Sequence, residues 1–275
     1  MSENSLNKTK AKTARRLGGV AHRSLHQTKR NNKMKRAYDW RMLFVLPAWV
    51  FTAFIMSQLI VVGAMQLVEV FGLSLDALMR PAVLQTVVAA TVYVLATAMT
   101  ILVPYALWQR KTSLRVLGMD QLPSWTDIGL APVAFFVYLI ATTVVMGAVV
   151  AFISGFPVDQ AQEIGFSTFG SRLDNALAFL TLVVLAPVAE EILFRGYLYG
   201  KLKKYIPTII AAIATSLLFA LVHFAWNVGV DVFVLGLVLC ALRSLTGSIW
   251  AGVLVHMLKN GVAYFILFIS PLMGG

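Results

Sequence analysis

The sequence predicts an all-α protein, a polytopic transmembrane helical bundle with about seven to eight spans. Of its 275 residues, 59% are hydrophobic and only 13% are charged, whereas in soluble domains about a quarter of the residues are charged. The hydrophobic residues form runs that are long enough to cross a hydrocarbon core as helices. These runs do not alternate polar and apolar residues as the strands of membrane β-barrels do, so helical spans are expected.

Seven apolar segments are expected to span the membrane. In chain order they cover approximately residues 42–68, 82–107, 128–153, 175–200, 206–225, 229–244 and 249–270. The sixth is short, with Asp231 and Arg243 near its ends, and is expected to be tilted or buried among other helices. Residues 155–173 mix aromatic and polar side chains and could form an eighth element at the membrane interface. The seven segments form one domain, residues 42–275.

Residues 1–41 differ from the rest of the chain in charge. They carry twelve Lys or Arg residues against two acidic residues, while the rest of the chain carries 11 basic and 10 acidic residues. This composition predicts a disordered cytoplasmic tail that contacts anionic lipid. A basic tail also suits nucleic acid, but no nucleic-acid partner is expected. The basic region and the apolar run after it are too long for a cleavable signal peptide.

Basic residues in the short loops predict the orientation of the spans, because cytoplasmic loops are enriched in Lys and Arg. Such residues cluster in the second and fourth loops: Arg110, Lys111, Arg115, Lys201, Lys203 and Lys204. With seven spans, both loops and the N-terminus lie in the cytoplasm and the C-terminus lies outside. The chain is therefore expected to be an integral membrane protein, in a bacterial plasma membrane.

Polar side chains interrupt three of the predicted spans. These residues are Glu190 and Glu191 in the fourth segment, His223 in the fifth, and His256 and Asn260 in the seventh. A charged side chain at membrane depth costs at least a few kcal/mol, so a function is expected for them. At about 1.5 Å of rise per residue, four of them fall near the middle of the membrane and could converge: Glu190, His223, His256 and Asn260.

Their chemistry suggests an active site. A buried carboxylate such as Glu190 can act as general base toward water, and the imidazole of His223 can help to hold that water. His256 and Asn260 lie on one helix face and could donate hydrogen bonds to an oxyanion. Glu191 and Arg195 are four residues apart, a spacing that predicts a supporting ion pair on one face.

Three sequence motifs resemble those of the CPBP intramembrane proteases. This family includes type II CAAX prenyl endopeptidases and bacteriocin-processing or self-immunity proteins of the Abi type. Its motifs are Glu-Glu-x-x-x-Arg, Phe-x-x-x-His and His-x-x-x-Asn/Asp, in this order. The sequence supplies Glu190-Glu191-Ile-Leu-Phe-Arg195, Phe219-Ala-Leu-Val-His223 and His256-Met-Leu-Lys-Asn260. The resemblance covers approximately residues 175–265.

The resemblance implies an endopeptidase that hydrolyses a peptide bond with glutamate-activated water. It assigns the catalytic roles to Glu190, His223, His256 and Asn260, and supporting roles to Glu191, Arg195 and Phe219. The substrate would be a peptide or protein, cut in peptide or bacteriocin maturation, self-immunity or CAAX-type processing.

The sequence leaves the cofactor open. There is no His-Glu-x-x-His zinc helix, yet a divalent metal such as zinc could be held by His223, His256 and Glu190. Lys259 is expected to be a counter-ion or to reach toward the interface, whereas Asp231 and Arg243 receive no role.

Two other functions also stay open. The chain could be a non-catalytic membrane immunity or scaffold protein of the same fold. It could also be a proton-coupled transporter, because buried carboxylates and histidines form proton relays. The lack of an internal repeat argues against the transporter.

Overall fold

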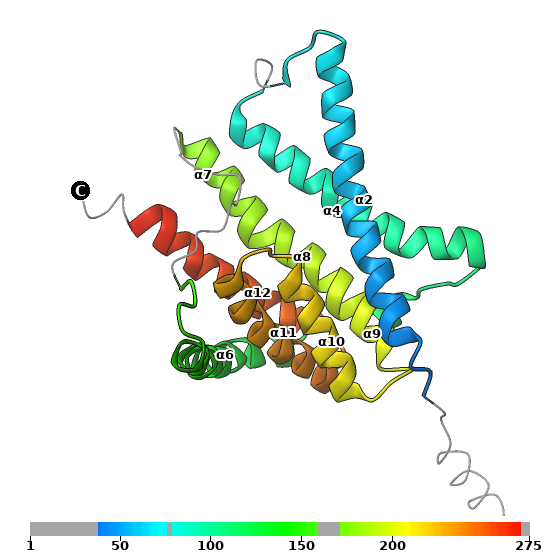
Figure 1. Ribbon diagram of the computed structural model, residues 1–275, viewed down its shortest axis with the longest axis vertical. Coiled ribbons are helices and arrows are strands. Elements are labelled where there is room, and N and C mark those ends of the chain that lie inside the picture. The colour runs from blue at the N-terminus through cyan, green and yellow to red at the C-terminus, as the bar shows by residue number, and fades with distance from the viewer. Residues whose placement is uncertain (1–37, 76–78, 159–170, 271–275) are drawn as a thin grey trace, which may run out of the picture. The chain divides into compact units, whose positions relative to one another are not determined.

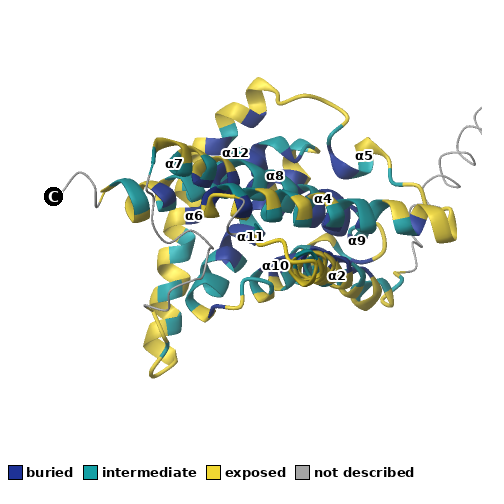
Figure 2. Ribbon diagram, turned by 90° about the horizontal axis from the view of Figure 1, so that it is seen from above, coloured by how far each residue is buried: buried dark blue, intermediate teal, exposed yellow. Residues whose placement is uncertain are grey.

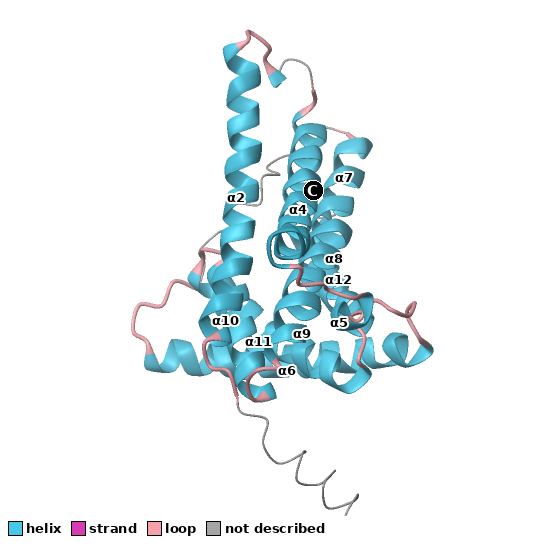
Figure 3. Cartoon of the chain, turned by 90° about the vertical axis from the view of Figure 1, so that its right-hand side faces the viewer, coloured by secondary structure: helices cyan, strands magenta, loops and turns pink. Residues whose placement is uncertain are grey.

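The computed structural model describes residues 38–75, 79–158 and 171–270. The fold class is confirmed, since helices and loops build these three ranges and no strand occurs in them (Figure 3). Six helices in the described ranges are long and apolar enough to cross a membrane. They are α2 (Met42–Val70), α4 (Pro81–Trp108), α6 (Trp125–Phe152), Arg172–Leu202, α11 (Trp226–Thr246) and Trp250–Ile269. The chain is therefore an integral membrane protein.

The fifth predicted span is a shorter helix than expected. This helix, α10 (Thr208–Leu221), has 14 residues, which corresponds to about 21 Å, less than the hydrocarbon core of about 30 Å. A still shorter helix, α5 (Leu114–Leu117), lies between α4 and α6. Most of the predicted interfacial element at 155–173 lies outside the described residues.

Internal contacts divide the chain into two units, Met1–Asp39 and Trp40–Gly275. The predicted basic tail, residues 1–41, lies almost entirely outside the described residues, so its disorder and its lipid contact stay predictions. The second unit contains all of the membrane helices described above.

One long helix, Arg172–Leu202, lies at the centre of the second unit and is called the central helix below (Figure 1). It consists of α7 (Arg172–Phe179), η1 (Leu180–Leu185), α8 (Ala186–Glu190), η2 (Glu191–Tyr199) and α9 (Gly200–Leu202), where η marks π-helical turns. Its segments contact α2, α4, α5, α10, α11 and α12 (Trp250–Tyr264). The Trp250–Ile269 span continues α12 through η3 (Phe265–Ile269).

The other helices pack in two groups around the central helix. Helix α2 packs on α4, and α11 packs on α6, α10 and α12. Burial is greatest along the central helix and α11, whereas α4 and α6 direct most of their residues outward (Figure 2). The outward residues of α4 and α6 are apolar, as expected for lipid-facing spans. Of the two alternatives for the sixth segment, the structure agrees with burial among other helices, because α11 packs on α6, α10 and α12.

Local sequence signals account for several helix ends. Helix α4 begins at Pro81, a position at which a backbone N–H would have no acceptor within the helix, so its absence in proline costs no hydrogen bond. Helix α6 begins with a capping box in which the backbone N–H of Asp127 donates to Ser124 Oγ at 3.1 Å and the Ser124 N–H donates to the Asp127 carboxylate at 2.9 Å. Helix α11 ends at Thr246 and is followed by Gly247, whose φ of +74° suits glycine.

Two glycines allow the central helix to approach α5 closely. Gly196 and Gly200 are four residues apart and so lie on one helix face. A Cβ atom at Gly200 would lie 2.5 Å from the carbonyl oxygen of Val116, and one at Gly196 would lie 3.1 Å from that of Leu117. Small residues at this spacing are typical of close helix contacts in membranes.

Replacing Gly200 with Ala is expected to lower the free energy of unfolding by about 1–3 kcal/mol, because the new methyl group overlaps a backbone oxygen. The measurement is unfolding of the purified protein in detergent micelles. Gly63→Ala is the matched control, since a Cβ atom there meets nothing within 4 Å. Equal stability of the two variants would contradict the close contact.

Candidate active site

The two adjacent glutamates lie where the central helix changes from α-helical to π-helical turns. Glu190 is the last residue of α8, and Glu191 is the first residue of η2. π turns occur frequently at functional sites, and their i→i+5 bonding redirects side chains relative to an α-helix. Glu191 is fully buried, whereas 14% of the Glu190 side chain is exposed. Glu190 is therefore the more accessible of the two carboxylates.

Glu191 forms a buried polar cluster with Arg195 and His256. Arg195 Nη1 donates to Glu191 Oε1 at 2.7 Å, and His256 Nδ1 lies 3.2 Å from the same oxygen. The ion pair expected from the four-residue spacing is thus present, with both side chains fully buried. Because His256 belongs to α12, this cluster connects α12 to the central helix.

Glu190 contacts two helices through its two carboxylate oxygens. The Tyr93 hydroxyl on α4 donates to Oε1 at 2.6 Å. Oε2 lies 3.6 Å from Nε2 of His256, the opposite ring nitrogen from the one that faces Glu191. His256 therefore lies between the two glutamates. Tyr93 was missed in the sequence analysis, because a tyrosine in an apolar span is common and carries no motif.

His223 lies past the end of α10, in the turn before α11. The predicted helical segment 206–225 is therefore wrong at its C-terminal end, because α10 stops at Leu221. His223 Nδ1 lies 2.7 Å from the carbonyl oxygen of Phe219. A continuing α-helix would direct the His223 backbone N–H to that oxygen, but this N–H donates to Ala220 at 3.2 Å. Phe224 follows with a φ of +53°, which turns the chain.

Phe219 joins the histidines to the ion pair. It is fully buried, and its ring lies edge-on to the rings of His223 and His256, at centroid distances of 4.9 and 5.7 Å. The Arg195 guanidinium lies 4.3 Å from its centroid, within the range of a cation–π contact. The structure thus brings together six of the predicted residues: Glu190, Glu191, Arg195, Phe219, His223 and His256.

Asn260 lies one helical turn beyond His256 on α12. Its Nδ2 donates to the carbonyl oxygen of Leu182, in η1, at 2.9 Å. An asparagine amide has two N–H groups, so one further donor is available. The role of Asn260 as an oxyanion donor stays a prediction.

A second polar cluster joins α6, α11 and α12. Asp231 Oδ1 accepts hydrogen bonds from the hydroxyls of Tyr138, at 2.5 Å, and Thr142, at 2.9 Å. Lys259 Nζ lies 3.4 Å from the other Asp231 oxygen. The expectation that Lys259 is a counter-ion agrees with this pair. Tyr138 and Thr142 were missed, because hydroxyls are frequent in membrane helices.

The predicted metal ligands, His223, His256 and Glu190, are not drawn together into one group of three. Among the described residues, no three His, Cys, Asp or Glu side chains are grouped to hold a metal ion. Nδ1 of His223 is engaged by a backbone carbonyl, and Nδ1 of His256 faces Glu191, an arrangement that leaves Nε2 of each ring for another partner. A metal-binding role of His223, His256 and Glu190 stays a prediction.

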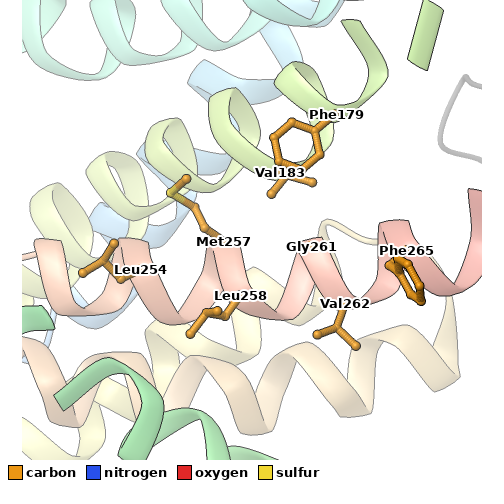
Figure 4. A pocket seen from close by; sticks show the side chains of 8 residues that line it. All are labelled: Phe179, Val183, Leu254, Met257, Leu258, Gly261, Val262 and Phe265. Atoms are coloured by element: carbon orange, nitrogen blue, oxygen red, sulfur yellow. The ribbon is translucent and has the colours of Figure 1, made fainter. Parts of the chain in front are cut away.

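Two apolar pockets flank the polar residues. One, of about 470 Å³, lies between the central helix and α12, where Phe179, Val183 and Met257 line it (Figure 4). The other, of about 890 Å³, is lined by residues of α2, α6, α10 and α11. Leu221 and Phe224 line it on either side of His223 in the sequence. Neither pocket is lined by Glu190 or His256.

Comparison with known proteins finds a protein family that is similar to the segment carrying these residues. Residues 172–262 match the family model described as type II CAAX prenyl endopeptidase Rce1-like. Residues 172–262, called the Rce1-like segment below, are therefore similar to this family. The resemblance drawn from the three motifs is confirmed for the Rce1-like segment, and the matched family is a protease family.

A curated relative matches a similar length of chain. This chain is 35% identical over 89 residues to that relative, a protein of Escherichia coli named "Uncharacterized 24.3 kDa protein". The match covers 30% of this chain and 41% of the relative, so the chain spans about two fifths of that protein. No solved structure matches the chain. All the motif residues described above, from Glu190 to Asn260, fall inside the Rce1-like segment.

Proposed function

We propose that the chain is an intramembrane endopeptidase that hydrolyses a peptide bond with water activated by Glu190. One observation carries this proposal. Glu190 Oε1 is engaged by Tyr93, while Oε2 faces His256 Nε2 at 3.6 Å and the side chain stays partly exposed. A carboxylate oxygen beside an imidazole in an apolar interior suits general-base chemistry.

The residues of the site suggest a role for each in the reaction. Glu190 Oε2 takes a proton from water while the water oxygen attacks the carbonyl carbon of the scissile bond. His256 Nε2 and the second N–H of Asn260 donate hydrogen bonds to the oxygen that becomes negative. Glu190 then gives the proton to the leaving amine as the carbon–nitrogen bond breaks. His223 helps to hold the water.

The apolar surroundings favour a substrate with an apolar segment. The pocket of about 890 Å³ reaches the turn that carries His223, so a hydrophobic part of a peptide or protein could lie there. We place the protein in a bacterial plasma membrane with its N-terminus in the cytoplasm. Maturation of a peptide or bacteriocin, self-immunity and CAAX-type processing are the settings that suit this chemistry.

Replacing Glu190 with Gln is expected to reduce cleavage at least about 100-fold, because it removes the base and keeps the size of the side chain. The measurement compares peptide termini in membranes of cells that express the wild type or the variant. Fragments that disappear in the variant are the products, and their intact precursors should accumulate.

Glu69→Gln is the matched control, because Glu69 is an exposed carboxylate on α2. Cells with this variant are expected to retain every wild-type fragment. Unchanged cleavage by folded Glu190→Gln protein would exclude hydrolysis at this site and favour a binding or scaffold role.

A further inference from the structure

Tyr93 is a polar contact of Glu190 that comes from outside the Rce1-like segment. It lies on α4, and its hydroxyl donates to Glu190 Oε1 at 2.6 Å. This distance is in the range of a charge-assisted O–H···O⁻ bond. The Tyr93 ring contacts Phe54 of α2, with the ring centroids 6.5 Å apart. Helix α2 therefore supports the side chain that contacts Glu190.

A second hydrogen bond links α4 to the central helix. Thr181 in η1 donates to the Thr86 hydroxyl at 3.1 Å. Thr86 precedes Tyr93 by seven residues, and its partner Thr181 precedes Glu190, the partner of Tyr93, by nine. Because both contacts occur in the same order along the two helices, α4 and the central helix run in the same direction. The wider π-helical turns of η1 accommodate part of this two-residue difference, because they hold more residues per unit length than α-helical turns. The two contacts fix the height of Glu190 relative to α4.

We propose that Tyr93 is a positioning residue, which holds the Glu190 carboxylate with Oε2 directed toward His256. This inference rests on the function proposed above. A glutamate side chain has three rotatable bonds, and within the described ranges the hydrogen bond to Oε1 comes from Tyr93. With Oε1 bound by Tyr93, the carboxylate has one orientation, and Oε2 is the oxygen available to a water molecule. Without the hydroxyl, the carboxylate is free to turn and either oxygen can face His256.

Tyr93→Phe tests this role because it removes the hydroxyl and keeps the ring against Phe54. The first readout is the carboxylate stretching band of Glu190, obtained as the infrared difference between the wild type and Glu190→Gln. Loss of the hydrogen bond is expected to shift this band. The second readout is turnover of a substrate identified by the terminal-peptide comparison. We expect kcat to fall about 10- to 100-fold, as for loss of a hydrogen bond to a charged group, with KM unchanged.

Tyr138→Phe is the matched control, because it removes a hydroxyl that donates to Asp231. It is expected to leave the Glu190 band in place. Thermal unfolding of both variants separates repositioning from loss of the fold. A Glu190 band that is the same in Tyr93→Phe and the wild type would overturn the inference. Since the infrared measurement needs no substrate, an inactive wild type would refute the proposed function and leave this test valid.

Discussion

Replacing Arg195 with Met is expected to lower the free energy of unfolding by about 3–5 kcal/mol, the usual effect of breaking a buried ion pair. Both partners of the Glu191–Arg195 pair are fully buried, so the remaining Glu191 charge gains no water. Its Oε2 already lacks a hydrogen-bond partner among the residues that the structure describes. His256 would be the remaining contact of Oε1. The measurement is unfolding in detergent micelles by heat or denaturant.

The same experiment has two controls. Arg115→Met removes an exposed ion pair with Asp120, whose nitrogen–oxygen distance is 3.9 Å, and should change stability by less than about 1 kcal/mol. The double variant Arg195→Met, Glu191→Gln should recover part of the lost stability, because no uncompensated charge stays buried. If Arg195→Met and Arg115→Met lost the same stability, the Glu191–Arg195 pair would not contribute the stability expected of a buried ion pair.

Replacing His256 with Ala is expected to reduce cleavage by about 10²- to 10⁴-fold, the range associated with positioned acid–base groups. The histidine faces Glu190 through Nε2 and Glu191 through Nδ1, so its loss affects both carboxylates. It also removes an edge-on contact of the Phe219 ring. The measurement is turnover of the identified substrate by purified protein.

Leu258→Ala is the matched truncation on α12, since Leu258 is exposed on that helix. It should retain wild-type turnover, whereas His256→Ala should not. Unfolding of both variants shows whether lost turnover reflects lost structure. A folded His256→Ala protein with wild-type turnover would exclude His256 from the reaction.

The fold class and much of the site could be predicted because they depend on strong local signals. Long apolar runs identify the spans, and charged residues within such runs are costly enough to stand out. The spacing of Glu191 and Arg195 determines that they share a helix face, and the structure contains the pair. Helix rise alone placed Glu190 and His256 at a similar depth, and the structure brings them to 3.6 Å.

The remaining details depend on tertiary contacts that a sequence does not display. The π-helical turns around Glu190 leave no compositional signal. Helix α10 ends before His223 where the His223 side chain, rather than its backbone N–H, contacts the carbonyl oxygen of Phe219. Tyr93 lies 97 residues from Glu190, and its contact depends on how α4 packs against the central helix. The C-terminal end of α10 could not be predicted from hydropathy, because the apolar residues continue beyond the end of the helix.

The cluster around Asp231 has a consequence for insertion of the chain during synthesis. Helix α11 brings Asp231 toward the bilayer before the residue that neutralises it, because Lys259 follows 28 residues later on α12. Helix α6 is synthesised before α11, so the hydroxyls of Tyr138 and Thr142 can donate hydrogen bonds to the carboxylate before Lys259 is made. A ribosome-bound chain that stops before α12 would therefore carry an unneutralised acid at membrane depth. Arrival of the last helix completes the charge pair and should make lateral release from the translocation machinery more favourable.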